Sequence, residues 1–222
     1  MTDLHTHILP GMDDGAPDVA TSLAMLESQR RQGVDTVVLT SHFYRMDESV
    51  GTFLSRRQAS FDALQEALPK DAPRLILGAE VAWYRAILEE PRIPELCIGD
   101  SHCLLLELPL QPWSETLLEQ VYQLAGVMGV TPILAHVERY LHLQKRGQLR
   151  ILQEMGIPMQ LSAEVFRKPL FRGKWCRMLS HGTWFLGSDC HNTDTRPPNL
   201  SVAASYIEKH LSNADEILSW QP

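Results

Sequence analysis

Residues 35–42, DTVVLTSH, form a short apolar run that ends in a histidine, and runs of the same kind recur along the chain. The others are TDLHTH (2–7), RLILGAE (74–80), CLLLELP (103–109), TPILAH (131–136), IPMQLSAE (157–164) and TWFLGSDCH (183–191). Strands that are apolar on both faces are typical of a parallel sheet covered by helices, so these runs predict an α/β fold.

Longer amphipathic stretches alternate with the strands and predict the covering helices. They span residues 18–32, 50–68, 82–90, 114–128, 143–155, 170–180 and 201–211. Glycine follows four of these stretches, at Gly33, Gly129, Gly156 and Gly182, as it does where a helix ends. The βα units can close into a barrel or remain an open sheet, and no linker divides them, so we expect one domain over residues 1–222.

The amino-acid composition excludes several classes of protein. The 222 residues are 44% hydrophobic, enough for one sizeable core, and the formal net charge is −7. This acidic balance argues against binding to a nucleic acid backbone, which requires a surplus of Lys and Arg. The cysteines form no CxxC pair and fit a reducing compartment. No apolar run is long enough for membrane insertion and the N-terminus lacks a signal-peptide pattern, so we expect a cytoplasmic protein.

Side chains that bind metals stand at the carboxyl ends of the predicted strands. They are His42, Glu80, Glu107, His136, Asp189 and His191, together with His5 and His7 of the first strand and Asp14 shortly after it. The carboxyl ends of parallel strands surround a common hollow, where α/β folds collect functional groups. Residues i and i+2 of a strand point the same way, so His5 and His7 can reach one ion. The same holds for Asp189 and His191.

These five histidines and four carboxylates would be costly to bury together without a cation. A mixture of imidazole and carboxylate suits Mn²⁺, Zn²⁺ or Fe²⁺. So many donors exceed the needs of one ion. They predict two or three ions, in an arrangement that generates hydroxide and holds a phosphoryl group.

Two arginines, Arg139 and Arg196, each follow a strand-end ligand by a few residues. Arginine binds a phosphate through two parallel hydrogen bonds, and surface salt bridges with Glu138 or Asp194 are the alternative role. Three divalent ions against four carboxylates leave a charge of about +2, which together with two arginines favours a dianionic phosphate monoester.

The motifs that carry these residues resemble, in order and over nearly the whole chain, the PHP (polymerase and histidinol phosphatase) superfamily. They are DLHTHILPGMDDGA, TSHF, GAEV, LLLELP, AHVERY and GSDCHN followed by RPP. Within the superfamily, HILPGxDDGA and AHxERY resemble most closely the bacterial metal-dependent protein-tyrosine phosphatases of capsule and exopolysaccharide loci.

This resemblance implies a distorted TIM-like (β/α)7 barrel with a trinuclear, usually manganese, centre. It implies that the same nine residues are the ligands and that Arg139 and Arg196 bind phosphate. The implied substrate is the phosphotyrosine tail of a bacterial tyrosine kinase that controls polysaccharide chain length, hydrolysed in line without a phosphoenzyme. The chain departs from the family at TSHF and AHVERY, where TPHH and AHPERY are more usual, and at Glu164, where small polar residues are usual. These departures concern the substrate rim rather than the metal ligands.

Two other phosphatase chemistries fit parts of the sequence. Cys190 and Arg196 have the C-x5-R spacing of cysteine phosphatases, although the loop lacks glycine and carries Asp194, which disfavours a thiolate. A small-molecule phosphatase of the histidinol-phosphate type would use the same metal site behind a more enclosed mouth. The sequence leaves the oligomeric state open.

Overall fold

The strands of this protein are all parallel to their neighbours. A computed structural model describes residues 1–145 and 147–220. Its strands are β1 (Thr2–Thr6), β2 (Thr36–Leu39), β3 (His42–Phe43), β4 (Arg74–Leu77), β5 (Glu80–Ala82), β6 (Cys103–Glu107), β7 (Thr131–Leu134), β8 (Met159–Ser162) and β9 (Trp184–Gly187). Every predicted strand segment is present. Two of them are each divided into two strands: residues 35–42 contain β2 and the start of β3, and residues 74–80 contain β4 and the start of β5.

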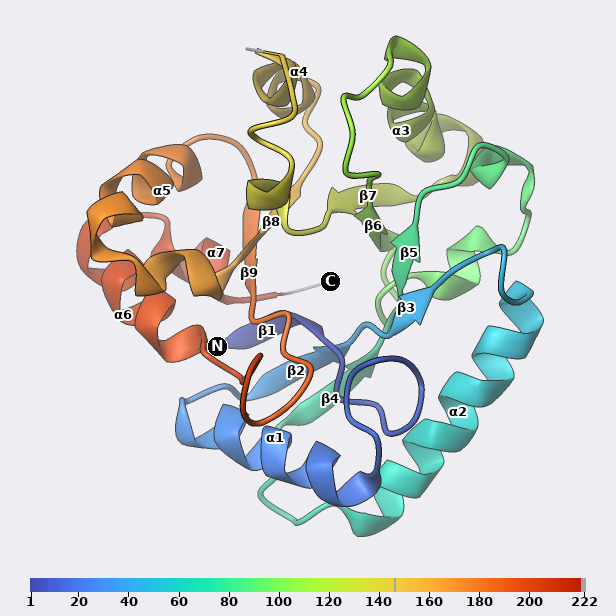
Figure 1. The fold of residues 1–222 in the computed structure, drawn as a ribbon, viewed down its shortest axis with the longest axis vertical. Coiled ribbons are helices and arrows are strands. Elements are labelled where there is room, and N and C mark those ends of the chain that lie inside the picture. Colours follow the sequence, from blue (N-terminus) through green and yellow to red (C-terminus); the bar gives the residue numbers. More distant parts are fainter. Residues whose placement is uncertain (146, 221–222) are drawn as a thin grey trace.

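The strands form two sheets that meet to close a ring (Figure 1). The sheet orders are β1-β2-β4 and β3-β5-β6-β7-β8-β9. The first and last strands lie side by side, because the N–H of Asp189 donates to the His5 carbonyl at 2.8 Å and that of His7 to the Cys190 carbonyl at 2.9 Å. The fold is therefore a distorted barrel, and the open-sheet alternative is excluded.

Helices surround this ring (Figure 1). They are α1 (Val19–Arg31), α2 (Val50–Ala67), α3 (Glu115–Met128), α4 (Gln148–Glu154), α5 (Arg172–Leu179), α6 (Leu200–His210) and α7 (Ala214–Leu218), with 3-10 turns η1 (Ile87–Glu89), η2 (Ile93–Leu96), η3 (Val137–Arg139), η4 (Ala163–Arg167) and η5 (Pro169–Phe171). Asp18, Ser49 and Ser114 cap the first three helices, each accepting a hydrogen bond from a backbone N–H three residues later. The four glycines predicted to end helices all have positive φ.

One predicted helix, over residues 82–90, is wrong. Ala82 pairs with Glu107 of β6, and the N–H of Trp83 donates to the Glu107 carbonyl at 2.8 Å. Pairing with β6 therefore holds the backbone at Ala82 and Trp83 in an extended conformation. Only the short turn η1 forms within the predicted helix. The helix predicted over 143–155 begins at Gln148, residue 146 lies outside the described residues, and α7 was not predicted.

The core has two parts, one inside the ring of strands and one between the strands and the helices. The inner part contains Leu4, Val38, Ile76, Ile98, Leu105, Ile133, Ala135 and Trp220. Leu4, Val38, Ile76, Leu105 and Ile133 lie within strands and precede their carboxyl ends, and the N–H of Trp220 donates to Thr2 at the start of β1. These side chains therefore fill the barrel beneath the carboxyl ends and leave that end to polar side chains. None of the helices in the described part of the chain combines the length and apolar character needed to cross a membrane.

Candidate metal centre

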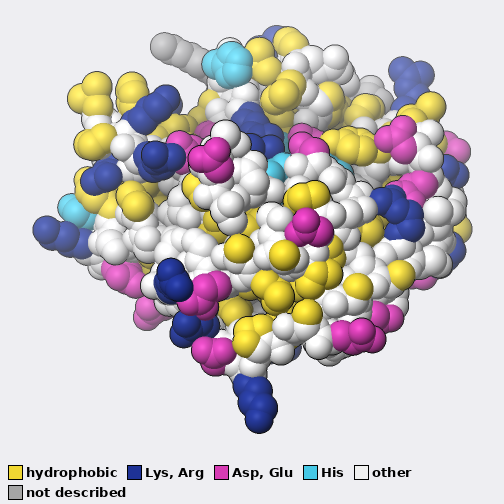
Figure 2. All heavy atoms as spheres, turned by 60° about the horizontal axis from the view of Figure 1, so that its bottom comes forward, with side chains coloured by type: hydrophobic (Ala, Val, Ile, Leu, Met, Phe, Trp, Pro, Cys, Tyr) yellow, Lys and Arg dark blue, Asp and Glu magenta, His cyan; other side chains and the backbone are white. Residues whose placement is uncertain are grey.

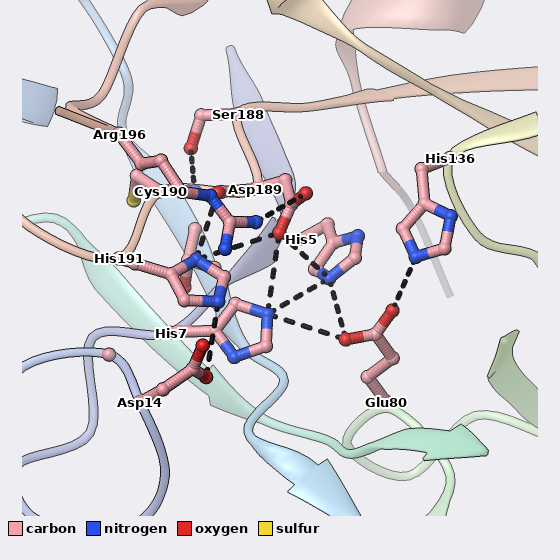
Figure 3. Close-up of polar contacts among 12 residues, drawn as sticks. His5, His7, Asp14, Glu80, His136, Ser188, Asp189, Cys190, His191 and Arg196 are labelled. Carbon is pink, nitrogen blue, oxygen red and sulfur yellow. Dashed lines mark hydrogen bonds and ion pairs between the residues drawn. The ribbon is translucent and has the colours of Figure 1, made fainter. Parts of the chain in front are cut away.

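The predicted ligand residues lie in one cluster at the carboxyl ends of the strands (Figure 3). Three overlapping sets of donors could each hold an ion: His7, Asp14, His42 and His191; His5, His7 and Glu80; and His42, Glu80 and Glu107. His136 and Asp189 border these sets, with His136 Nε2 2.8 Å from Glu80 Oε1 and Asp189 Oδ1 3.5 Å from His7 Nε2. The structure thus brings all nine residues together, and their role as ligands stays a prediction.

A bulge in β1 directs the first two histidines into the site. Asp3 pairs with Val37 and Thr6 with Leu39, so β1 has one more residue than β2 over this stretch. Leu4 belongs to the apolar barrel interior, whereas the Nε2 atoms of His5 and His7 lie 3.1 Å apart and are buried. The expectation that both histidines face the same way is met.

Two polar side chains fix the orientation of these imidazoles. The Asp13 carboxylate accepts from His7 Nδ1 at 2.8 Å, and the Gln160 amide oxygen accepts from His5 Nδ1 at 3.1 Å. A proton held at Nδ1 leaves the Nε2 lone pair directed into the cluster, which is how carboxylates and carbonyls orient metal-binding histidines. Burial opposes charge on His7, but the hydrogen bonds with Asp13 and with other carboxylates outweigh it and raise its pKa in the metal-free protein.

His191 is held in the form that a metal ligand requires. Its Nδ1 donates to the Asp189 carbonyl at 3.0 Å, so Nε2 is the free nitrogen, 3.4 Å from Asp14 Oδ1. Burial and the neighbouring His7 lower the pKa of His191 to about 4. The ring is therefore neutral near pH 7 and has no proton to lose on binding a cation.

Glu80 occupies the centre of the cluster. One of its oxygens, Oε2, lies 3.2 Å from His5, 3.4 Å from His7 and 2.9 Å from His42, yet none of these ring nitrogens forms a hydrogen bond with it. Burial opposes ionisation of Glu80, but the imidazoles around it keep its pKa well below the usual range. A buried, ionised oxygen facing three ring nitrogens is an environment that a divalent cation would stabilise.

His191 Nε2 is likewise buried without a hydrogen-bond partner among the described residues. Such groups are costly unless a partner is supplied. The imidazole and carboxylate donor set and these unpartnered atoms therefore fit divalent cations.

Asp189 connects the cluster to the two predicted arginines. Its Oδ1 faces His5 and His7, whereas its Oδ2 accepts from Arg139 and forms an ion pair with Arg196, whose Nη2 lies 2.8 Å away. Burial opposes ionisation of this carboxyl, but the imidazoles and Arg139 lower its pKa far below the usual value. Asp189 has a φ of 53°, and such strained conformations in residues other than glycine occur preferentially at functional sites. The arginines therefore make an ion pair in the site, rather than with Glu138 or Asp194.

Sequence reasoning missed Asp13 and Gln160. Asp13 adjoins the predicted ligand Asp14, and its carboxylate also accepts from the N–H of His42 at 2.9 Å and of Gly15 at 3.0 Å. Gln160 is a polar residue within the apolar run IPMQLSAE, and its amide oxygen also accepts from the His136 N–H at 2.6 Å. That isolated polar residue was the available signal.

Cys190 does not lie where a nucleophile would have to be. Its thiol is fully buried, and the sulfur points away from the imidazole cluster (Figure 3), toward Gln29 of α1 at 3.8 Å. Burial and the nearby Asp3 raise the pKa of Cys190 well above the usual value, so the thiolate needed for attack is disfavoured. The geometry argues against the cysteine-phosphatase alternative.

Comparison with known sequences gives consistent results. The family model described as capsular polysaccharide synthesis, CpsB/CapC, matches residues 1–219. The tyrosine-protein phosphatase CpsB of Streptococcus pneumoniae is 32% identical, over 94% of this chain and 90% of its own. The tyrosine-protein phosphatase YwqE of Bacillus subtilis (strain 168) is 28% identical, over 96% of this chain and 86% of its own.

Solved structures share the fold. A crystal structure from work on YwqE of Bacillus subtilis and CpsB of Streptococcus pneumoniae, described as unique metal-dependent tyrosine phosphatases, matches with a TM-score of 0.73 and 25% identity, covering 100% of this chain and 98% of that chain. The putative histidinol phosphatase hisK of Listeria monocytogenes matches with a TM-score of 0.53 and 13% identity, over 86% of this chain and 95% of its own. The second match shows a common fold only.

Proposed function

The chain belongs to the CpsB/CapC family of capsular polysaccharide synthesis, and we propose that it is a metal-dependent protein-tyrosine phosphatase. The family match confirms the resemblance inferred from the motifs of the sequence. We also propose that residues 1–222 act as one phosphatase domain, because β1 and β9 from opposite ends of the chain complete the same site.

The position of Asp189 carries this proposal. Its carboxylate is shared between the imidazole cluster and the arginines Arg139 and Arg196, so a dianionic group that contacts the cluster also lies within reach of two guanidinium groups. Guanidinium groups bind phosphate oxygens in a bidentate manner and stabilise charge that develops during transfer. Arg139 and Arg196 would therefore bind the phosphate and hold the phosphorus in line with an attacking water.

We propose the nine cluster residues as ligands for two or three Mn²⁺ ions, with Zn²⁺ or Fe²⁺ as alternatives: His5, His7, Asp14, His42, Glu80, Glu107, His136, Asp189 and His191. When bound, such ions activate water as a nucleophile and neutralise charge on the phosphoryl oxygens. The chain itself supplies the ligand orientation, through Asp13 and Gln160, and a buried floor that excludes bulk solvent.

The proposed substrate is phosphotyrosine in the tail of a bacterial tyrosine kinase that regulates capsular or exopolysaccharide synthesis. A cavity of about 560 Å³ borders the site at Arg139, Asp189 and Arg196, and its rim includes exposed Lys168 and Phe171. Such a cavity is larger than a phosphate group requires and can admit part of a protein chain.

The decisive experiment compares hydrolysis of three substrates by the purified protein: a phosphotyrosine peptide, the matching phosphoserine peptide and histidinol phosphate. Each is assayed with added Mn²⁺ and with EDTA. We expect phosphate release from the phosphotyrosine peptide alone, and we expect EDTA to abolish it. Preference for histidinol phosphate would replace the protein substrate with a small molecule at the same metal site, and activity that survives thorough chelation would overturn the metal chemistry.

A further inference from the structure

Two hollows flank the metal centre. The first, of about 330 Å³, is lined by Asp13, Asp14, Asp47 and Glu48 together with Arg56, which pairs with Glu48. The second, of about 560 Å³, is lined by the site residues Arg139, Asp189 and Arg196 and extends along η4, η5 and α5. We call the second hollow the α5 cavity.

The α5 cavity contains two free cations. Lys168 and Lys174 both line it, both are exposed, and neither forms an ion pair with any residue in 1–145 or 147–220. Arg139 and Arg196 are already paired with Asp189 at the edge of the site. In a chain whose net charge is −7, two uncompensated lysines beside the active site form a local positive field.

The carboxylates of the cavity wall are engaged elsewhere. Glu164 lies 3.4 Å from Arg167 and accepts from Asn199 Nδ2 at 2.9 Å. Glu138 accepts from the Ser162 N–H at 3.2 Å. Apart from Arg139 and Arg196, which are proposed to bind the phosphate, the lysines are therefore the cations of this cavity that have no ion-pair partner among the described residues.

Aromatic side chains provide the apolar part of the same cavity. Phe171 is 47% exposed, and Trp175 anchors α5 in the core while lining the cavity. Lys174 Nζ lies 4.6 Å from the centre of the Trp175 ring, so the aromatic surface helps to hold this cation in place. Figure 2 shows dark-blue and yellow side chains gathered along its left edge, the side on which α5 lies in Figure 1.

We propose that the α5 cavity binds the polypeptide next to the reacting phosphotyrosine and selects for acidic side chains there. Aspartate or glutamate near the phosphotyrosine would approach Lys168 and Lys174. The aromatic surface would pack against the chain of the bound peptide. This inference rests on the proposed function and specifies its substrate as an acidic phosphotyrosine segment.

The test measures kcat/KM for two phosphotyrosine peptides of equal length, one with aspartate and one with serine at the positions within three residues of the phosphotyrosine. p-Nitrophenyl phosphate, which lacks a flanking chain, reports on the metal centre alone. For the wild-type protein we expect the acidic peptide to be preferred about fivefold, mainly through KM, and we expect salt to weaken the preference. The doubly substituted Lys168→Ala, Lys174→Ala protein should lose the preference and retain hydrolysis of p-nitrophenyl phosphate.

Lys209→Ala, which removes an exposed lysine of α6, is the matched control and should keep the preference. Equal use of both peptides by the wild-type protein, or a preference that survives the double substitution, would overturn the subsite while the phosphatase activity stands. Loss of binding to phosphatidylglycerol vesicles with no change in peptide preference would instead assign these lysines to a membrane surface. Failure to hydrolyse either peptide, with p-nitrophenyl phosphate still cleaved, would overturn the proposed function and the subsite with it.

Discussion

Arg196 Nη2 lies 2.8 Å from Asp189 Oδ2, while the other oxygen of that carboxylate lies 3.5 Å from His7 Nε2. Asp189 thus contacts both the arginine pair and the imidazole cluster. Because the arginines approach the oxygen that faces away from the cluster, their removal should affect phosphate binding and leave the metal donors in place. The two groups of residues can therefore be separated by mutation.

Arg196→Ala should reduce kcat/KM for a phosphotyrosine peptide about 100-fold, as removal of one donor to a developing oxyanion does in other enzymes. Metal content, measured by mass spectrometry after dialysis, should be unchanged, and Arg139→Ala should behave in the same way. Arg31→Ala, at an exposed arginine paired with Glu27 on α1, is the control and should leave both quantities unchanged. Normal turnover in Arg139→Ala or Arg196→Ala would remove that arginine from the phosphate site.

His5→Ala and Asp189→Ala should lose bound metal and activity together, because each removes a donor from the centre of the cluster. The measurement is metal content per chain alongside kcat/KM. A variant that keeps its full metal content shows that the substituted residue is not a ligand.

Gln160→Leu should weaken metal binding about 10- to 100-fold, since loss of an outer contact to a metal-binding histidine has effects of this size. The leucine cannot accept from His5 Nδ1, so the His5 ring loses its orienting contact, and the backbone N–H of His136 loses its acceptor. Titration with Mn²⁺ gives the dissociation constant, and Gln65→Leu on the exposed face of α2 is the matched control. An unchanged constant in Gln160→Leu would show that other contacts orient the His5 ring.

The parallel strands and the ligand cluster could be predicted from the sequence because both follow from a local pattern, whereas closure into a barrel was implied only by the family resemblance. Apolar runs that end in His or a carboxylate define parallel strands and the edge at which their side chains meet, and Glu80 and His136 do lie 2.8 Å apart although 56 residues separate them. What could not be predicted depends on contacts between distant segments. Gln160 is recognisable as an orienting group only once β8 lies beside His5, and the segment after Glu80 is extended only because β6 pairs with it.

Cys190→Ser should leave kcat/KM within about twofold of the wild-type value, since a buried thiol with a raised pKa does not act as a nucleophile. The serine hydroxyl can take the place of the thiol beside Gln29 without adding volume. EDTA should abolish activity in both proteins. Abolished activity in Cys190→Ser, in protein that still binds metal, would revive the cysteine mechanism.

The metal-free protein should become less stable as pH rises from 6.5 to 8. Burial lowers the pKa of His136, but hydrogen bonds with Glu107 and Glu80 outweigh it and raise the pKa to about 9, and His7 is shifted in the same direction. An unfolded histidine has a pKa of about 6.5 and releases its proton in this window, whereas the folded protein retains it. The stabilisation is therefore fully present below pH 6.5 and is lost as pH rises toward 9, at about 1.4 kcal/mol per pH unit for each retained proton.

Urea unfolding of the EDTA-treated protein at pH 6.5, 7.2 and 8.0 measures this slope. Unfolded cysteines, with a pKa of about 8.5, also begin to ionise near pH 8, and comparison with a histidine variant cancels their contribution. In metal-free His136→Gln the change in unfolding free energy with pH should be smaller by the contribution of one retained proton, because glutamine does not titrate. Mn²⁺-loaded wild-type protein should show a weaker dependence, since ions that occupy the cluster displace the same protons. A slope that is identical in wild-type and His136→Gln proteins would show that His136 is neutral in the metal-free fold.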